Sequence, residues 1–266
     1  MVYIAHNHEA SVRRQVALAE PSRPRRWLMQ ADAAKYARLE QILVGKAALV
    51  TAITDNDART FAETKPIASI LTLPPGYNGR VLQHRVLTPA TPRKVVLVGK
   101  FEWVAKQLNL TRWAHEAVPL LNALGIETQV VGTVPSALQA RLARPGLSFA
   151  GPVAEIQPYL CDARFGLVAE DVGGGFKLKT LDYLFHRLPI AALDGNLAGL
   201  PEAIIANTMV ADTPRALAGS IIARIDDLEQ LNQMQHNAFR AAQTAFDWEE
   251  RARRFLHALD RLDQNV

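Results

Sequence analysis

The segment FGLVAEDVGGGFKLKTLDYLFHRLPIAAL, residues 165–193, decides the fold. It starts with an apolar strand at 165–170, passes a glycine-rich turn, and continues as a helix at 176–187. A second apolar strand follows at 189–193. Two strands that are joined through a helix run parallel, because the crossover returns the chain to the same edge of the sheet. The segment therefore predicts a parallel α/β sheet.

The same alternation of strand and helix surrounds this segment. Strand patterns occur at 94–99, 127–132 and 147–151, and helical patterns at 111–125, 134–144, 156–163 and 201–207. Short apolar strands that alternate with helices predict a doubly wound α/β domain, covered by helices on both faces. In such sheets, ligands bind beyond the carboxyl ends of the strands. The glycines at 173–175 follow one of those ends.

The first 91 residues have a less regular pattern. Strands are predicted at 2–5 and 50–54, an amphipathic helix at 33–49, and a further helix that Asp55 and Asp57 begin. Proline and glycine predict a loop at 71–79 and a linker at 87–93. We therefore expect a partial N-terminal domain at 1–91 and a Rossmann-like domain at 92–245.

The composition is that of a soluble globular protein. Of 266 residues, 49% are hydrophobic and 21% are charged. No apolar run approaches the roughly 20 residues that span a bilayer, and the first residues lack the pattern of a secretory signal. The single cysteine, Cys161, excludes an internal disulfide and fits a reducing compartment. We expect Cys161 to be a small buried hydrophobic residue rather than a nucleophile.

The formal net charge of +4 is small, but arginines are concentrated near the N-terminus. The cluster consists of Arg13, Arg14, Arg23, Arg25 and Arg26. Such a cluster can bind phosphates of a lipid, a nucleotide or a nucleic acid, or can be a solvated helix and loop. The sequence has no zinc-finger spacing and no RNA-binding signature, so we do not expect a nucleic-acid partner.

The turn EDVGGGFKLKTLDY, residues 170–183, has the composition of an anion site. Gly173–Gly175 allow close backbone approach and offer amide donors ahead of a helix. If the helix starts near Phe176, Lys177 lies in its first turn. Lys179 and Asp182 are then neighbours on one face. A lysine there can neutralise phosphate charge, and Asp182 can accept hydrogen bonds from a sugar diol.

Other motif readings of this turn fail on particular residues. A P-loop requires glycine immediately before Lys179, where Leu178 stands, and Lys177 and Leu178 interrupt the spacing of a dinucleotide fingerprint. An NAD(P)-dependent oxidoreductase is therefore a distant alternative. The alternative interpretation, in which the segment is only a flexible turn before an amphipathic helix with solvated lysines, is also consistent with the sequence.

Together with its flanks, the sequence resembles the nucleotide-sugar-binding half of retaining GT-B glycosyltransferases, in particular glycosyltransferase family 4. The resemblance covers roughly residues 94–257. It rests on the order of VLVGKFEWVAKQLN, VVGTVP, FAGPVAEIQPYLCDARFGLVAE, GGGFKLKTLDYLFHRLPIAAL, LAGLPEAI and FDWEERARRFLHAL. Weaker matches upstream are YIAHNHEAS, LEQILVGKAALVTAITDNDARTF and LPPGY, which look like the later part of the acceptor domain. The resemblance makes 246–266 a C-terminal helix that packs back towards the N-terminal domain.

The resemblance assigns roles to individual residues. In the family, the nucleotide sugar lies between two Rossmann-like domains without a bound metal or other cofactor. A basic pair that holds the diphosphate maps to Lys100 and Lys106, an acid that binds donor-sugar hydroxyls to Glu170, and a ribose-binding acid to Asp182. A histidine that approaches the donor sugar from the acceptor domain maps to His6. The sequence departs from the family in having more than seven residues between the two acids, and Asp in place of Glu at the second.

The function that the resemblance implies is transfer of a sugar from a nucleotide diphosphate sugar to a saccharide or lipid-linked acceptor, as in polysaccharide biosynthesis. The catalytic residues would be His6, Lys106 and Glu170. The donor-binding residues would be Lys100, Lys106, Gly173, Gly174, Gly175, Phe176, Lys177, Lys179 and Asp182. His8 and Glu9 could contact the acceptor or cap the next helix; a metal site with His6 is not expected, because no further ligands cluster nearby.

Two further expectations concern the whole protein. The chain begins in what the resemblance makes mid-domain, so we expect a fragment, or a reading frame that starts further upstream. A non-catalytic nucleotide-sugar-binding or interaction protein is therefore the alternative function. The resemblance also implies a cytoplasmic protein whose arginine cluster makes peripheral contact with the inner face of the membrane.

Overall fold

The computed structural model describes residues 1–64, 69–172 and 175–263, which divide into two compact units. The first unit comprises residues 1–78, 172–176 and 245–266, and the second comprises 79–171 and 177–244. The chain therefore passes between the units several times. Each unit is described separately below.

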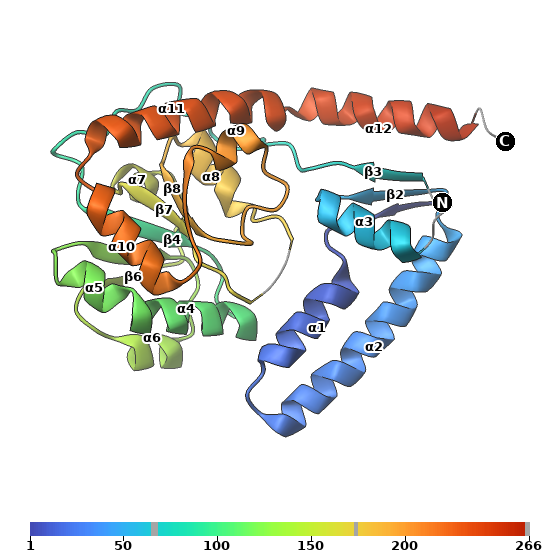
Figure 1. The fold of residues 1–266 in the computed structure, drawn as a ribbon, viewed down its shortest axis with the longest axis horizontal. Coiled ribbons are helices and arrows are strands. Elements are labelled where there is room, and N and C mark those ends of the chain that lie inside the picture. Colours follow the sequence, from blue (N-terminus) through green and yellow to red (C-terminus); the bar gives the residue numbers. More distant parts are fainter. Residues whose placement is uncertain (65–68, 173–174, 264–266) are drawn as a thin grey trace. The chain divides into compact units, whose positions relative to one another are not determined.

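The second unit contains a parallel sheet of six strands (Figure 1). Its elements are, in order, β4 (Lys94–Val98), α4 (Val104–Glu116), α5 (Val118–Asn122), β5 (Glu127–Val131), α6 (Ser136–Leu142), β6 (Leu147–Gly151), α7 (Gln157–Cys161), β7 (Phe165–Val168), α8 (Lys179–Phe185), β8 (Ile190–Leu193), α9 (Glu202–Ile205), β9 (Thr208–Ala211), α10 (Pro214–Arg224) and α11 (Leu228–Ala245).

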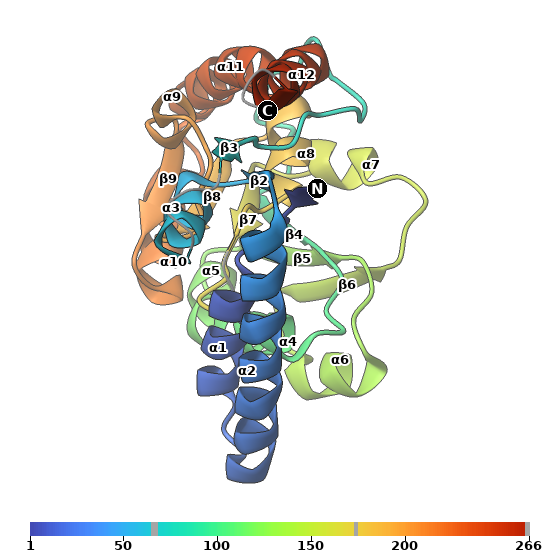
Figure 2. The ribbon, with the colours of Figure 1, turned by 90° about the vertical axis from the view of Figure 1, so that its right-hand side faces the viewer.

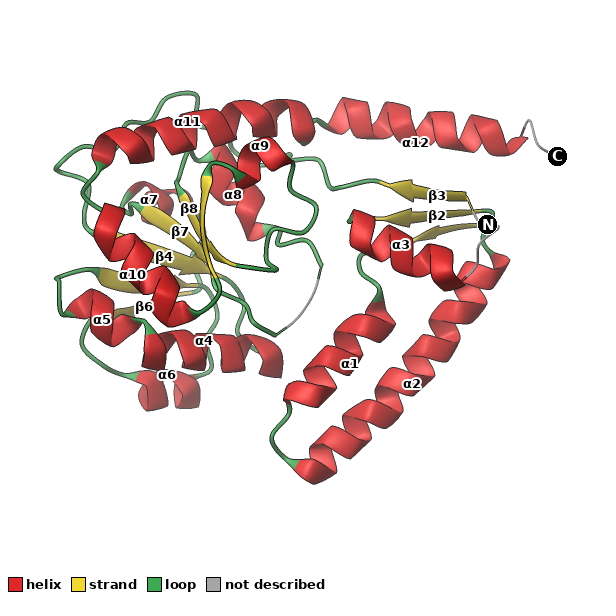
Figure 3. Ribbon diagram, in the orientation of Figure 1, coloured by secondary structure: helices red, strands yellow, loops and turns green. Residues whose placement is uncertain are grey.

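The strand order β6-β5-β4-β7-β8-β9 makes this sheet doubly wound. From β4 the chain winds outwards through β5 and β6, and then resumes on the other side of β4 with β7, β8 and β9. Figure 3 shows these strands in yellow between the helices. The buried core includes Val95, Leu97, Trp113 and Leu167, all at most 3% exposed. The predicted parallel α/β fold is confirmed.

Three features of this unit differ from the sequence prediction: a helix, a strand and the exposure of a cysteine. The helix expected at 111–125 is two helices that meet at Ala117, because Pro119, the second residue of α5, lacks the amide hydrogen that would continue the first helix. The sixth strand, β9, was not predicted, since its pattern TMVA is only partly apolar and Val210 is exposed. Cys161, expected to be buried, is exposed at the end of α7.

The segment ahead of β4 is fixed to the second unit. The guanidinium of Arg85 donates to the carbonyl oxygens of Ala163 (2.7 Å) and Cys161 (3.1 Å). Leu87 is 2% exposed, and both its amide and its carbonyl are bonded to the Asn232 side chain. Residues 87–93, expected to be a linker, are thus partly anchored, and the units divide at 78–79 where we expected 91–92.

The first unit has a three-stranded parallel sheet in the order β1-β2-β3. Its elements are β1 (Val2–Ile4), α1 (Glu9–Ala19), α2 (Arg23–Lys46), β2 (Leu49–Ala52), α3 (Asp55–Thr64), β3 (Ser69–Thr72) and α12 (Trp248–Asp263). Helices α1 and α2 form a hairpin, as Figure 2 shows. The expected loop at 71–79 begins later than predicted, because β3 extends to Thr72 and stops just before the prolines at 74 and 75.

The C-terminal helix α12 belongs to this first unit. Arg254 of α12 donates to the carbonyl of Thr72 at 2.9 Å, and the amide of Tyr77 donates to the carbonyl of Phe246 at 2.9 Å. Gly76 has no room for a side chain, since a Cβ there would lie 2.6 Å from the ring of Trp248. Among the helices that the structure describes, none is long and apolar enough to cross a membrane.

Candidate functional site

The switch point of the second sheet lies between β4 and β7. The chain leaves β4 towards one side of the sheet and leaves β7 towards the other, so the two following loops diverge there. Such a divergence leaves a crevice at the carboxyl ends of the strands, where ligands of open α/β sheets bind. The loop after β4 leads to Lys106 on α4, and the loop after β7 carries Glu170 and Lys177.

Glu170 is the centre of a buried charge cluster at this switch point. Its Oε1 lies 2.5 Å from Nζ of Lys179, and its Oε2 lies 3.2 Å from Nζ of Lys177. The side chains of Glu170, Lys177 and Lys179 are 9%, 7% and 10% exposed. Lys106 is near enough to act electrostatically on both Glu170 and Lys179. The cluster therefore holds three lysines and one carboxylate, an excess of positive charge.

The cluster shifts the pKa of the Glu170 carboxyl. Burial alone would raise it, but the charges of Lys179 and Lys177 outweigh burial and lower the pKa of Glu170 to about 2. Burial lowers the pKa of Lys179, with Glu170 opposing that effect. The carboxylate is consequently ionised throughout the neutral range.

A small cavity of about 10 Å³ opens on the cluster. Lys106, Glu170 and Lys179 line it together with Asn109. The structure therefore brings together three of the predicted site residues, Lys106 from α4, Glu170 from the loop after β7 and Lys179 from α8. A volume of this size suits a single water molecule, so a larger ligand must approach from outside the cavity.

Asn109 and Arg112 of α4 support the loop that carries Glu170. The side-chain oxygen of Asn109, which is buried, accepts from the amide of Asp171 at 3.0 Å, and Arg112 pairs with the Asp171 carboxylate at 2.6 Å. Sequence reasoning missed both residues. The available signal was Asn109 itself, a polar residue on the apolar face of α4, one turn after Lys106.

Tyr183 fixes α8 against the sheet. Its hydroxyl accepts from the amide of Val98 at 3.1 Å, at the end of β4, and its ring covers Gly166 of β7. A Cβ at Gly166 would lie 2.6 Å from that ring, so only glycine permits the contact. Burial raises the pKa of the Tyr183 hydroxyl. The helix that carries Lys179 is therefore anchored at both strands of the switch point.

The remaining described residues of this unit that were predicted for the site are Lys177, Asp182 and Lys100, and none of the three lines the cavity. Helix α8 begins at Lys179, so Lys177 precedes it and does not lie in its first turn as predicted; its side chain instead turns inward to Glu170. Asp182 is in the first turn of α8 but does not line the cavity. Lys100 follows β4 and is exposed. Gly173 and Gly174 lie outside the described residues.

Two predicted donor-binding residues group with the first unit. The ring of Phe176 packs edge-to-face on Phe246, with ring centroids 5.7 Å apart. Gly175 has φ +73°, and a Cβ there would collide with the side chain of Asn7. This one position therefore requires glycine for both its backbone conformation and its space.

The histidines after β1 have different surroundings. His6 is exposed and lies two residues after the end of β1 at Ile4, one residue further from the strand than the predicted end at residue 5 implied. His8 is the N-cap of α1: its Nδ1 accepts from the amide of Ser11, and its Nε2 lies 3.3 Å from the Glu40 carboxylate. Glu40 also accepts from the amides of Glu9 and Ala10 (2.9 and 3.1 Å). His8 thus has the capping role, one of the two alternatives above.

No group of three or more His, Cys, Asp or Glu side chains is placed to hold a metal ion within the part of the chain that the structure describes. The charges at the switch point come from lysines and one glutamate. Lysine is a cation with no lone pair to offer at neutral pH. This cluster is therefore suited to an anion.

Comparison with known protein families matches a large part of the chain. The family described as Glycosyl transferases group 1 matches residues 92–227, just over half of the 266 residues. The chain belongs to this family. The matched region runs from the start of β4 to the start of α11, so the group 1 region includes the whole switch-point cluster. Comparison with curated proteins finds no significant match.

Solved structures of glycosyltransferases share the fold of this group 1 protein. Sucrose-phosphate synthase from Thermosynechococcus elongatus matches with a TM-score of 0.73 and 16% identity, over 100% of this chain and 68% of that one. HepE from Anabaena, solved with UDP-glucose, matches with a TM-score of 0.65 and 14% identity, over 98% of this chain and 72% of HepE. TarM of S. aureus matches with a TM-score of 0.69 and 12% identity, over 84% of this chain and 46% of TarM. The chain thus spans less than half the length of TarM. The shared fold of these structures confirms the predicted GT-B fold.

Proposed function

We propose that this protein binds a nucleotide diphosphate sugar at the switch-point cluster and transfers the sugar, with retention of configuration, to a saccharide or lipid-linked acceptor. The observation that carries the proposal is the position of Lys106, Glu170 and Lys179 in one cavity at the carboxyl ends of β4 and β7. The family match and the UDP-sugar complex of HepE support it. Assignment to glycosyltransferase family 4 is part of the same proposal.

The charges of the cluster fit the chemistry of the proposed reaction. Cleavage of the bond between sugar and phosphate leaves negative charge on the nucleoside diphosphate. Lys177 and Lys179 are buried and held in place by Glu170, and Lys106 lines the same cavity, so these cations would stabilise that charge with little reorganisation. Such fixed cations would take the place of a metal ion, and no cofactor is required. Glu170 would orient donor hydroxyls, and Asp182 would accept from the ribose.

One observation favours a non-catalytic binding protein as the second candidate. Both oxygens of Glu170 are engaged by lysines in this structure. A carboxylate held in this way positions the lysines for a diphosphate, but has fewer lone pairs left for donor-sugar hydroxyls. A protein that binds the nucleotide without turning over the sugar would show this arrangement too.

Membrane contact through the α1–α2 hairpin is the last part of the proposal. Leu18, Trp27 and Leu28 are at least 60% exposed around the turn of the hairpin. Arg14, Arg23 and Arg25 are exposed beside them, whereas Arg13 pairs with Asp32 and Arg26 donates to the carbonyl of Glu20. Exposed aromatic and basic residues together are the composition of a segment that binds an anionic membrane surface.

Calorimetry with uridine and guanosine diphosphates, followed by a donor-hydrolysis assay, tests the function. We expect binding of one nucleotide and release of sugar from its donor. Lys106→Ala should weaken nucleotide binding by on the order of 1.5–3 kcal/mol, the value of a charged hydrogen bond. The loss should shrink with added salt.

Arg141→Gln is the matched control, because Arg141 is an exposed cation of the same unit that does not line the cavity. Nucleotide binding without hydrolysis would favour the binding protein. Failure to bind either nucleotide would rule out both candidates. Retention is tested separately, by the anomeric configuration of the first product seen by NMR.

A further inference from the structure

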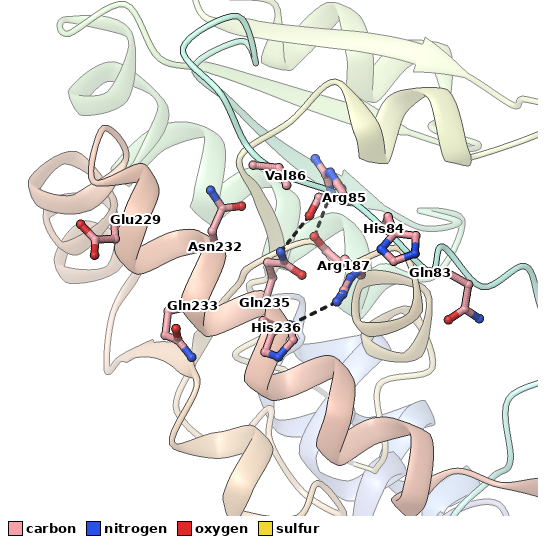
Figure 4. Close-up of a pocket in the computed structure, with 10 residues that line it drawn as sticks. All are labelled: Gln83, His84, Arg85, Val86, Arg187, Glu229, Asn232, Gln233, Gln235 and His236. Atoms are coloured by element: carbon pink, nitrogen blue, oxygen red, sulfur yellow. Dashed lines mark hydrogen bonds between the residues drawn. The ribbon is translucent and has the colours of Figure 1, made fainter.

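A second cavity lies at the other end of α8. It has a volume of about 710 Å³ and is lined by residues of the 83–86 segment, by Arg187 just after α8, and by one face of α11 (Figure 4). None of these residues has a part in the proposed transfer reaction. Helix α8 has seven residues, so its ends are roughly 10 Å apart. The cavity is large enough for a small metabolite.

Arg187 is the unusual residue of this cavity. It is 7% exposed, and its Nε and Nη1 have no hydrogen-bond partner among the described residues. Its Nη2 lies 3.3 Å from Nδ1 of His236, and one face of the guanidinium is covered by the Phe239 ring, 4.4 Å away. No described carboxylate forms an ion pair with it. Burying a guanidinium whose N–H donors lack acceptors costs folding free energy, unless a ligand or a water molecule accepts those hydrogen bonds.

The backbone at Arg187 adds a second cost. Its φ of +52° is the left-handed conformation. The amides of Arg187 and Leu188 donate to the carbonyls of Leu184 and Tyr183, which is the closing motif of a helix and usually places glycine where Arg187 stands. The chain therefore has arginine at a position where glycine would fit with less strain.

Gln235 supplies the complementary group. It is 5% exposed, and its amide nitrogen donates to the carbonyl of Arg85 at 3.1 Å, which fixes the orientation of the amide. Its Oε1 has no donor within the part of the chain that the structure describes. Glu229 also lines the cavity, but it lies seven residues before His236 on α11, roughly 10 Å along the helix. Figure 4 shows Glu229 at one edge of the cavity, away from Arg187 and His236, which lie together near its middle.

We propose that this cavity binds the phosphate group of a small phosphorylated molecule, held by Arg187 with His236 and Gln235. A guanidinium edge matches two phosphate oxygens. A hydroxyl on the ligand or on a monohydrogen phosphate supplies the donor that Gln235 Oε1 needs. An ionised carboxylate group would satisfy Arg187 but, unlike a monohydrogen phosphate, has no hydroxyl of its own to donate to Gln235. The volume leaves room for the organic part of the molecule.

The test uses the full chain with inorganic phosphate and with glycerol 3-phosphate, at constant ionic strength. Histidine ring signals are followed by NMR, and affinities by calorimetry. We expect saturable binding that shifts the His236 ring signal, assigned from its loss in His236→Asn. Glycerol 3-phosphate should bind more tightly than phosphate, because it fills more of the cavity and carries hydroxyls. Weaker binding of the ester would overturn the small-molecule part of the proposal.

Arg187→Gly is the decisive variant. Glycine suits the backbone at this position, so the variant should keep the unfolding temperature of the parent while its phosphate affinity falls about tenfold or more. Arg141→Gln, which removes an exposed arginine elsewhere in this unit, should bind phosphate as the parent does. Phosphate binding that survives Arg187→Gly, or that disappears in Lys106→Ala instead, overturns the proposal. The second outcome would place the phosphate at the switch-point cluster.

Discussion

At the scale of single residues, Glu170 shows that a carboxylate predicted for a binding site can also have a structural role. Lys177 and Lys179 follow Glu170 in the chain, and both reach its carboxylate. The sequence could predict that these residues belong to one site, because they surround one strand end. It could not predict that the lysines pair with Glu170, because side-chain pairing depends on how the turn folds.

Glu170→Gln should destabilise the protein in a pH-dependent manner. The folded-state pKa of about 2 lies below the ordinary value of 4.5, so ionised Glu170 contributes stability above about pH 4.5. That contribution falls away as the pH drops towards 2. We expect the variant to lose on the order of 3 kcal/mol of unfolding free energy at pH 7. Urea unfolding at pH 7, 5 and 3.5 measures the loss.

The difference between parent and variant should be nearly constant from pH 7 to 5 and should shrink at pH 3.5. Glu102→Gln is the control, since Glu102 is an exposed carboxylate in the same unit. A loss that grows on acidification would have the wrong sign for an ion-paired carboxylate, and would show that Glu170 is not stabilised by its lysines.

Asp182→Ala should discriminate between two forms of the nucleotide. If Asp182 accepts from the ribose hydroxyls, its removal weakens binding of the ribonucleotide by about 1.5–3 kcal/mol and that of the 2′-deoxy form much less. Calorimetry with both nucleotides measures the two losses. Asp194→Ala, at an exposed position after β8, serves as the control. Equal losses for the two nucleotides would remove Asp182 from the donor site.

At the scale of elements, strands with a buried apolar run could be predicted from the sequence, and marginal elements could not. Strands β4, β7 and β8 are fully or almost fully buried runs, and their patterns predicted them. Strand β9 lies at the edge of the sheet and is only partly buried, with Val210 exposed, so its pattern is too weak to distinguish from a loop. The start of α8 was also missed, because the burial of Lys177 against Glu170 depends on tertiary contacts.

The α1–α2 hairpin gives the prediction that belongs to this scale. Exposed Trp27 and Leu28 stand beside exposed Arg23 and Arg25 at the start of α2. The double variant Trp27→Ser with Leu28→Ser should reduce pelleting with anionic vesicles several-fold, because less apolar surface enters the interface. High salt should release the parent by screening its arginines.

The matched control is Leu39→Ser with Ile42→Ser, two exposed apolar residues in the second half of α2. Its pelleting should equal that of the parent. Vesicles of neutral lipid should bind neither protein. Equal, negligible pelleting of the parent with anionic and neutral vesicles at low salt would show that this hairpin has no membrane role.

At the scale of the whole molecule, the sequence predicted two α/β parts but placed their boundary by composition. Proline-rich residues 87–93 suggested a linker, whereas buried Leu87 and the bonds from Arg164 to the carbonyl of Thr91 anchor them to the second unit. Such anchors come from residues far away in sequence, so they leave no local signal. The chain returns to the first unit at 172–176 and at 245–266. Composition does not predict these returns, for the same reason.

Hydrogen exchange over the whole chain tests where a nucleotide acts. With UDP at about 100 times its dissociation constant, binding stabilises the bound state by about 2.7 kcal/mol. We expect exchange to slow most in peptides that cover residues 99–110 and 175–185, which surround the switch point, and to stay unchanged in α1 and α2. Lys106→Ala should remove the effect at the same UDP concentration. Protection confined to peptides 82–87 and 229–236 would instead place the nucleotide beside Arg187, and uniform slowing along the chain would leave the switch point without a special role.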